Sequence, residues 1–277
     1  MKKNRSTYIL ILIFVVGLSV MLYPTVSDYI NQKHQSEAVA AYDEKVSQMS
    51  EQDYSEIFEK AENYNKELAK DPEAIYSPDE VNGYDDILDI SGTGIMGYIT
   101  IDKLDVKLPI YHGTSAEVLE IACGHLKGSS LPVGGESTHS VLSAHRGLPR
   151  AKLFTDLDKM EEGDTFTVTV LNKVLTYQVD RIAIVQPEEV EGLQIEQGKD
   201  YCTLMTCTPY GINSERLLVR GHRIPTEAKK NTQVTTEAFQ IEPLMVAIVM
   251  AVPMLILLLI VMLIYQKKKR SEKIHEK

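Results

Sequence analysis

Residues 203–219 carry the side chains best suited to nucleophilic chemistry. Residues 203–207 read as a short strand that ends at Cys207, a turn containing Pro, Gly and Asn follows, and a second strand begins at Arg216. We therefore expect Cys207 and Arg216 at facing ends of two strands. A thiolate is a strong nucleophile, and a guanidinium stays charged and can bind an oxyanion. The alternative is a small buried cysteine beside a solvated arginine.

Such a nucleophile needs a partner that moves protons, and the chain has seven histidines. His145 stands out because residues 139–145 read as a strand and an Arg-Gly-Leu-Pro turn follows, so that the imidazole lies at a strand end. Imidazole is the side chain that titrates nearest neutral pH. For the other six histidines we expect structural or surface roles: His34, His112, His125, His139, His222 and His275.

These residues fall within longer blocks that resemble one enzyme family. Residues 203–207, Thr-Leu-Met-Thr-Cys, match the Thr-Leu-x-Thr-Cys signature of sortases, and Arg216 follows nine residues later, as in that family. Other blocks are similar to the class C, pilus-assembling branch of Gram-positive bacteria and span about residues 95–224. They are residues 97–99, 108–114, 128–135, 143–149, 151–157 and 206–213.

The resemblance implies a role for each of the three candidate residues. Cys207 would be the nucleophile that forms a thioacyl intermediate, His145 the general acid and base, and Arg216 the group that steadies the oxyanion or positions the peptide. One departure is Glu215, where the branch more often has a histidine. Because neighbouring residues of a regular strand point to opposite faces, Glu215 need not neutralise Arg216.

Class C sortases commonly carry a lid, an Asp-Pro-aromatic tripeptide whose aspartate pairs with the catalytic arginine and whose ring covers the cysteine. This chain has Asp71 and Pro72 but Glu73 in the aromatic position, and Tyr76 is the nearest substitute. The resemblance therefore implies a weak or rearranged lid formed by Asp71, Pro72 and Tyr76. A plain linker remains the alternative.

The resemblance also implies a substrate class. A sortase of this branch cleaves an LPxTG-like sorting signal of a pilin or surface protein between Thr and Gly and joins it to a pilin lysine amine. Three alternatives stay open: a cell-wall anchoring sortase that uses a peptidoglycan amine, a membrane-anchored cysteine peptidase that only hydrolyses, and a non-catalytic surface scaffold. We expect no cofactor and no metal site, since Glu188, Glu189 and Glu191 fit a solvated acidic loop better than a calcium site.

Two apolar runs, residues 8–23 and 243–265, are candidates for membrane helices. The first lacks an obvious cleavage pattern, which favours an uncleaved anchor. Lys and Arg flank the outer end of each run, so the positive-inside rule places both termini in the cytoplasm and the domain between them outside it. The formal net charge of −10 argues against a nucleic-acid partner.

Between these runs the sequence predicts helices followed by a mainly β domain. Apolar residues recur at helical spacing over residues 31–70, and residues 153–160 predict one or two helical turns. Short strands with regular turns indicate a barrel or sandwich, and the resemblance implies a closed sortase-type β-barrel. Besides the strand at residues 139–145, the predicted strands are residues 98–101, 165–170, 175–185, 201–207 and 216–224.

The chain is therefore expected to consist of six parts. They are a cytoplasmic tail and membrane anchor (1–28), a helical and possible lid segment (29–93), the catalytic barrel (94–225), a tether (226–242), a transmembrane helix (243–265) and a basic cytoplasmic tail (266–277). The three cysteines form no disulfide framework. Cys123 and Cys202 could pair with each other, or they are two small apolar residues beside one reactive thiol.

Overall fold

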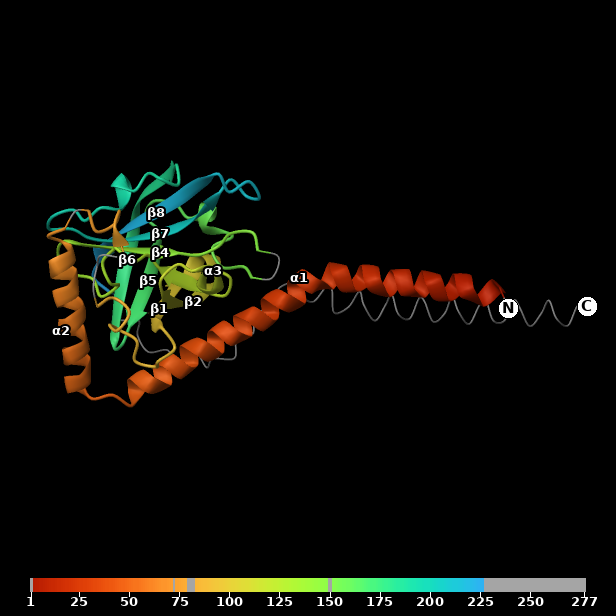
Figure 1. Cartoon of the computed structure of the whole chain (residues 1–277), viewed down its shortest axis with the longest axis horizontal. Coiled ribbons are helices and arrows are strands. Elements are labelled where there is room, and N and C mark those ends of the chain that lie inside the picture. The colour runs from red at the N-terminus through yellow and green to blue at the C-terminus, as the bar shows by residue number, and fades with distance from the viewer. Residues whose placement is uncertain (1, 72, 79–82, 149–150, 227–277) are drawn as a thin grey trace, which may run out of the picture. The chain divides into compact units, whose positions relative to one another are not determined.

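The computed structural model describes residues 2–71, 73–78, 83–148 and 151–226. Two N-terminal helices precede eight strands (Figure 1). The elements are α1 (Lys2–Ser47), α2 (Glu51–Leu68), β1 (Ile95–Ile101), β2 (Val106–His112), α3 (Ala116–Leu119), β3 (Cys123–His125), β4 (Thr138–Ser143), β5 (Thr165–Val170), β6 (Lys173–Val185), β7 (Asp200–Thr208) and β8 (Glu215–Ile224), with short 3-10 turns at Asp102–Leu104, Leu157–Lys159 and Glu191–Leu193.

The eight strands form a closed barrel in the order β1-β2-β3-β4-β7-β8-β6-β5, and β5 pairs with β1 to complete the ring. Most neighbours are antiparallel, whereas the β2–β3 and β4–β7 pairs are parallel. Closure leaves the sheet without a free edge, which removes a template for aggregation. The predicted mainly β, closed barrel is confirmed.

The barrel interior is filled by apolar side chains from every wall. Residues of β7 alternate between two faces, so that Leu204 points inward among other fully buried residues while Met205 is only half-buried. Inward-facing residues with no exposed surface include Ile99, Ile101, Ile110, Leu142, Val170 and Val219. This packed interior holds the outer face of β4, β7 and β8 rigid.

The helix α1 continues from Lys2 through Pro24 to Ser47 instead of stopping at the proline. Proline removes one backbone donor, and a long helix can tolerate that loss. The C-terminal part of α1 packs on the barrel through Tyr42, whose hydroxyl donates to the Met96 carbonyl at 3.0 Å and accepts from the Leu171 N–H at 2.9 Å. Burial raises the pKa of this tyrosine.

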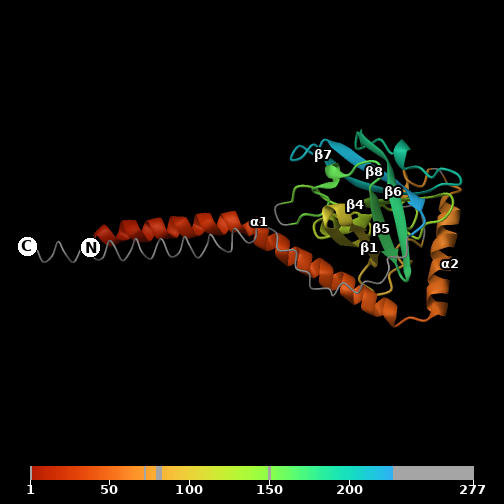
Figure 2. The same cartoon turned by 180° about the vertical axis from the view of Figure 1, so that it is seen from behind.

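The helix α2 lies beside the barrel (Figure 2). It begins at a capping box, in which the Ser50 side chain accepts from the Asp53 N–H and the Asp53 carboxylate accepts from the Ser50 N–H. Its apolar face is buried, and Asn65 exchanges two hydrogen bonds with the Leu131 backbone. The α2 side chains buried on this face are Tyr54, Phe58, Ala61, Tyr64, Asn65 and Leu68.

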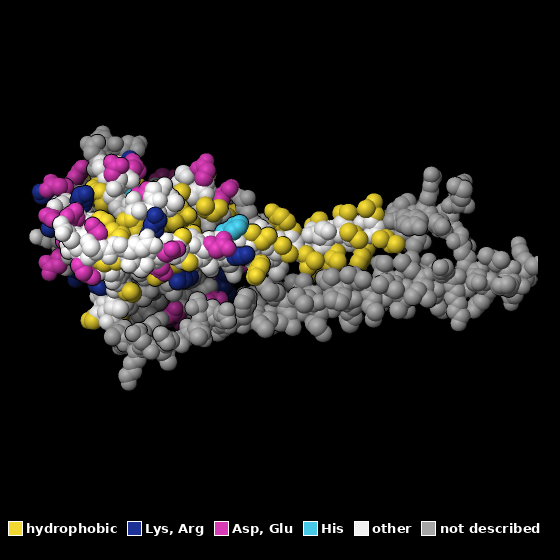
Figure 3. Space-filling model, turned by 90° about the horizontal axis from the view of Figure 1, so that it is seen from below, with side chains coloured by type: hydrophobic (Ala, Val, Ile, Leu, Met, Phe, Trp, Pro, Cys, Tyr) yellow, Lys and Arg dark blue, Asp and Glu magenta, His cyan; other side chains and the backbone are white. Residues whose placement is uncertain are grey.

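One helix in the described part of the chain, Ile11–Ser47, is long and apolar enough to cross a membrane. Its described N-terminal residues expose apolar side chains (Figure 3), among them Leu12, Ile13 and Val20. This supports a membrane anchor at the N-terminal side of the barrel. The second apolar run, residues 243–265, the basic tail, and all of the predicted tether except residue 226 lie outside the described residues.

Candidate active site

Cys207 and Arg216 are cross-strand partners in the β7–β8 hairpin. The neighbouring rungs pair Thr206 with Leu217 and Thr208 with Glu215. Thr206 and Thr208 are buried, whereas Cys207 is partly exposed, so Cys207 lies on the outer face of the barrel wall. Directly opposed residues have Cβ atoms about 4.5–5.5 Å apart. The expected hairpin therefore places Cys207 and Arg216 opposite each other on adjacent strands.

Arg216 is held by the turn that follows Cys207. Its Nη1 donates to the Glu215 carbonyl at 3.0 Å and to the Asn213 carbonyl at 3.4 Å. Within the described residues, no carboxylate lies within ion-pair distance of Arg216. Glu215 pairs with Thr208 and so lies on the other face of the strand, as its position beside Arg216 in a regular strand predicts.

His145 lies on the neighbouring wall, at the same end of the barrel as Cys207. The parallel ladder of β4 and β7 ends at Ser143 and Met205, and two further bonds continue it: the Ala144 N–H donates to the Met205 carbonyl at 3.2 Å, and the Thr206 hydroxyl donates to the Ala144 carbonyl at 2.8 Å. His145 follows directly and is partly buried. The strand thus ends two residues earlier than predicted, because β4 gives way to a loop at Ala144.

The one or two helical turns predicted for residues 153–160 are observed as a single 3-10 turn, Leu157–Lys159. The loop before it folds back on itself, since the Phe154 N–H donates to the His145 carbonyl at 3.2 Å. Phe154 and Leu157 have no exposed surface, which anchors the loop in the barrel core. The backbone of His145 is therefore fixed on both sides.

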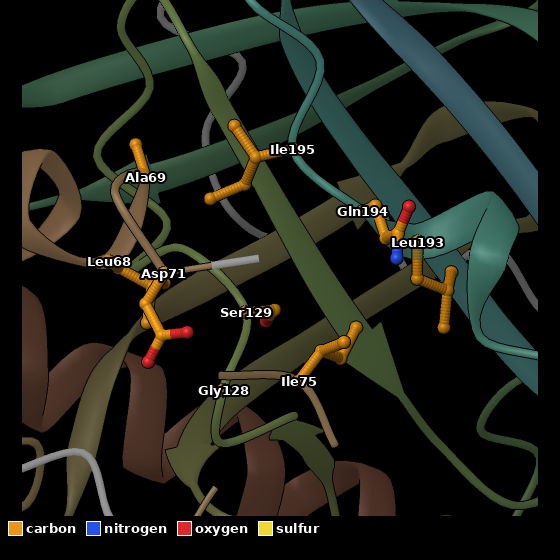
Figure 4. Close-up of a pocket in the computed structure, with 9 residues that line it drawn as sticks. All are labelled: Leu68, Ala69, Asp71, Ile75, Gly128, Ser129, Leu193, Gln194 and Ile195. Carbon is orange, nitrogen blue, oxygen red and sulfur yellow. The ribbon is translucent and has the colours of Figure 1, made fainter. Parts of the chain in front are cut away.

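Asp71, one of the predicted lid residues, makes a local turn. Its Oδ1 accepts from the Glu73 N–H at 3.0 Å, and among the described residues no ion pair joins it to Arg216. Asp71 lines a small cavity of about 80 Å³, with Leu193 and Gln194 on the opposite side (Figure 4). Pro72 lies outside the described residues. A lid in this chain would therefore not depend on an Asp71–Arg216 pair.

The segment that carries Tyr76 contacts the outer face of the barrel. Ile75 packs against an apolar group formed by Val141, Leu193 and Leu218, which we call the outer-face cluster. The Gln194 Nε2 donates to the Tyr76 hydroxyl at 3.4 Å. Met205, two residues before Cys207, also packs on this cluster. Ile75, which the sequence did not single out, thus packs on the same cluster as Met205 of the strand that carries the thiol.

The loop between β6 and β7 is held against the outer face of the barrel by a hydrogen bond to β4. His139, a buried residue of β4, has Nδ1 2.9 Å from the Gln194 carbonyl and Nε2 2.7 Å from the Thr203 hydroxyl. A neutral imidazole satisfies both contacts by donating to the carbonyl and accepting from the hydroxyl. Burial lowers the pKa of His139 to about 4, which keeps the ring neutral. From the sequence, His139 could be recognised only as the first residue of a predicted strand, and its contacts with Gln194 and Thr203 could not be predicted.

A network of ion pairs around Arg220 also holds the β6–β7 loop against the barrel. The Arg220 guanidinium makes a bidentate contact with Asp180, at 3.0 and 3.1 Å, and a contact of 3.1 Å with Glu196. It also stacks over Tyr201, 4.1 Å from the ring centroid. A bidentate guanidinium pair of this kind fixes geometry as well as charge. The loop thus joins β4, β6 and β8.

The three cysteines differ in exposure. Cys123 and Cys202 are buried and unpaired, and burial raises the pKa of both thiols well above the usual range. Cys207 alone is partly exposed. No group of three or more potential metal ligands from His, Cys, Asp and Glu occurs in the part of the chain that the structure describes, the acidic residues 188–191 included.

Comparison with known proteins identifies the family to which this fold belongs. A family model described as "Sortase domain" matches residues 99–224. The crystal structure of sortase C1 from Streptococcus agalactiae is 51% identical, with a TM-score of 0.64 and coverage of 69% of this chain and 100% of that one. Sortase C from Streptococcus pneumoniae is 47% identical, also with a TM-score of 0.64, covering 69% of this chain and 97% of that one.

A more distant relative, Sortase D of Bacillus subtilis, is 30% identical over 131 residues, which are 46% of this chain and 63% of that protein. The match thus spans less than two thirds of that relative. The chain belongs to the sortase family of cysteine transpeptidases, and its solved structural relatives place it in class C.

Proposed function

We propose that this chain is a membrane-anchored transpeptidase that cleaves an LPxTG-like sorting signal between Thr and Gly and joins it to a pilin lysine amine. The observation that supports it most strongly is the pairing of Cys207 with Arg216 on adjacent strands, with His145 at the same end of the next strand. The Streptococcus pneumoniae relative, whose structure is described as informative on pilin substrate specificity, supports pilins as the substrate class.

In the first half-reaction, the Cys207 thiolate attacks the Thr carbonyl of the sorting signal, and a C–S bond forms. Arg216 stabilises the oxyanion that develops, since its guanidinium is free of carboxylate partners among the described residues. His145 then donates a proton to the Gly amine as the C–N bond breaks. The products are a thioester on Cys207 and a released C-terminal fragment.

In the second half-reaction, the lysine amine of a pilin attacks the thioester. His145 accepts a proton from the attacking nitrogen, an isopeptide bond forms, and the C–S bond breaks to return the Cys207 thiolate. The same imidazole therefore serves first as acid and then as base. Its fixed backbone is suited to both tasks, because each proton is transferred at the same position next to the sulfur.

The segment containing Tyr76 acts as a lid in this proposal. Ile75 on the outer-face cluster occupies apolar surface that leads along β7 towards Cys207, and a hydrophobic residue of the sorting signal would compete for it. The single long contact to Gln194 makes this a weak closure. The lid therefore differs from the Asp-Pro-aromatic pattern in depending on Ile75 and Tyr76 instead of Asp71.

The membrane arrangement is also part of the proposal. The apolar helix α1 supports one anchor. The run at 243–265, followed by Lys267, Lys268, Lys269 and Arg270, predicts a second span with both termini in the cytoplasm and the barrel outside the cell. With this topology the barrel lies on the side of the membrane to which exported substrate proteins are delivered.

Product analysis tests this function. The full chain in detergent is mixed with a sorting-signal peptide and a candidate pilin, and the products are identified by mass spectrometry. We expect a Thr-to-lysine isopeptide product. Transfer to a peptidoglycan amine in preference to the pilin would instead indicate a cell-wall anchoring enzyme, and release of a free Thr carboxylate with every amine acceptor would indicate a peptidase.

A further inference from the structure

Arg146, the residue after His145, is a largely buried cation. Its side chain is 9% exposed, and Nη2 forms an ion pair with Asp158 in the 3-10 turn of the same loop. Its Nε is buried without a hydrogen-bond partner among the described residues. Burying a guanidinium with an unsatisfied N–H is costly, so a residue of this kind needs a compensating contact.

The backbone around Arg146 is held on both sides. The His145 carbonyl accepts from the Phe154 N–H at 3.2 Å, and the Gly147 N–H donates to the Thr155 hydroxyl at 3.1 Å. The Arg146 side chain therefore leaves the loop in a fixed direction. That direction leads to the turn after Cys207, which the chain reaches only sixty residues later.

The contact on that turn is Tyr210. The guanidinium carbon of Arg146 lies 5.8 Å from the centre of the Tyr210 ring, within the range of a cation–π contact. The same ring covers Gly147, where an added Cβ would lie 2.9 Å from Tyr210 Cε2, and Gly147 has a φ of +75°. Any side chain at position 147 would therefore displace the tyrosine.

Tyr210 in turn belongs to a closed turn between Cys207 and Arg216. The N–H groups of Ile212 and Asn213 both donate to the Pro209 carbonyl, at 3.1 and 2.9 Å. The Asn213 carbonyl accepts from Arg216. A displacement of Tyr210 would thus be transmitted to the residues on both sides of this turn.

We propose that Arg146 is a positioning residue that sets the separation of His145 from Cys207 through its paired contacts with Asp158 and Tyr210. The inference rests on the proposed function of Cys207 and His145. The Ala144 backbone joins β4 to β7 beside the site, and the Arg146–Tyr210 contact joins the two loops at the rim. Proton transfer between imidazole and leaving amine depends on this separation, and a displacement of about 1 Å can cost about 100-fold in rate.

The test is a set of variants of the full chain in detergent, assayed for thioester formation with a sorting-signal peptide. Arg146→Met is expected to lower kcat about 10- to 100-fold while KM stays within about twofold, because peptide binding does not use this residue. Tyr210→Leu, at a site that is 61% exposed and so tolerant in folding, is expected to lower kcat about tenfold. Tyr210→Phe keeps the ring and should recover most of that loss.

A double variant at Arg146 and Tyr210 shows whether the two residues affect kcat through their mutual contact or independently of each other. If Arg146 and Tyr210 act together, Arg146→Met/Tyr210→Leu is within about twofold of Arg146→Met alone. Lys159→Met is the matched control, since it removes an exposed cation from the same loop, and its kcat should equal that of the parent. Circular dichroism and thermal unfolding report the folded fraction of each variant.

Three outcomes overturn the inference: a parental kcat in Arg146→Met, a loss that a smaller folded fraction accounts for in full, or multiplicative effects in the double variant. Cys207→Ala is measured in parallel. If Cys207→Ala still cleaves the sorting-signal peptide, the proposed function itself is wrong. If Cys207→Ala is inactive and Arg146→Met is as fast as the parent, only the positioning role is wrong.

Discussion

Cys207 and Arg216 occupy one rung of the β7–β8 hairpin, on the outer face of a closed barrel. The rungs on either side are filled by buried threonines, Thr206 and Thr208, so the hairpin cannot shift its register without turning these residues outward. The register therefore fixes how the backbones of Cys207 and Arg216 face each other. The guanidinium extends from that position towards the turn, where it donates to the Asn213 carbonyl.

This pairing predicts that Arg216→Ala lowers kcat of thioester formation about 100- to 1,000-fold, the loss expected when an oxyanion donor is removed. Arg216→Lys should recover only part of it, because an ammonium lacks the planar set of donors. Quenched time-point assays of thioester formation with a sorting-signal peptide measure kcat for the two variants. Arg181→Ala, which removes an exposed arginine from the adjoining strand β6, is the control and should leave kcat unchanged. A parental rate in Arg216→Ala would contradict the assignment.

The exposure of the three thiols predicts selective labelling. Cys123 and Cys202 are buried and their pKa values are raised, so both accessibility and thiolate population oppose their reaction. Iodoacetamide should therefore modify Cys207 alone in the folded protein and all three cysteines in urea. Peptide mass mapping after timed labelling distinguishes these states. Labelling of Cys202 at the rate of Cys207 would mean that the barrel opens readily.

The contacts of the lid segment predict faster access to Cys207 when they are removed. Ile75→Ala and Tyr76→Ala should each raise the rate of Cys207 alkylation by a bulky maleimide several-fold, since they release the segment from the outer-face cluster and from Gln194. Asp71→Ala should have a smaller effect, because its described bond is to the Glu73 N–H. Glu67→Ala on α2 is an exposed control. Unchanged rates in both Ile75→Ala and Tyr76→Ala would reject the lid.

Two buried histidines predict how stability depends on pH. Burial lowers the pKa of His125 and of His139 to about 4, below the unfolded value of about 6.5. The unfolded chain therefore binds more protons between these values, and the stabilisation present above pH 6.5 is lost as pH falls towards 4. Each histidine should contribute a loss on the order of 3 kcal/mol over that window.

Urea unfolding in detergent between pH 7.5 and 4.5 measures this loss. The variant His139→Asn keeps an amide donor for the Gln194 carbonyl but cannot titrate, so the free energy of unfolding should fall less steeply with acid than in the parent. His34→Asn, at an exposed position of α1, is the matched control. Identical pH slopes in the parent and His139→Asn would contradict a buried neutral imidazole at this position.

Much of the site could be predicted because it is local in sequence. The two strands that carry Cys207 and Arg216 are separated by one turn. Their pairing therefore follows from the Pro, Gly and Asn residues between them. The placement of His145 required the resemblance as well, because the parallel pairing of β4 with β7 joins segments some sixty residues apart. No single-residue pattern fixes such a pairing.

The remaining contacts depend on packing that the sequence pattern does not contain. The strands Val106–His112 and Cys123–His125 were not predicted, since the second is only three residues long and both are defined by their barrel neighbours. Asp71 accepts a hydrogen bond from the Glu73 N–H, and Ile75 packs on the outer-face cluster. Both contacts form in the segment after α2, which lies next to the β6–β7 loop. Buried charges such as Arg146 resemble surface residues until the loops around them are known.

The most direct test of the account is the intact mass of the full-length enzyme after incubation with a sorting-signal peptide and no amine acceptor. We predict a mass increase equal to the Leu-Pro-x-Thr acyl fragment, located on the peptide that contains Cys207, removed by hydroxylamine and absent in Cys207→Ala. An unmodified Cys207 in enzyme that nonetheless cleaves the peptide, or an adduct on another residue, would contradict the thioacyl mechanism.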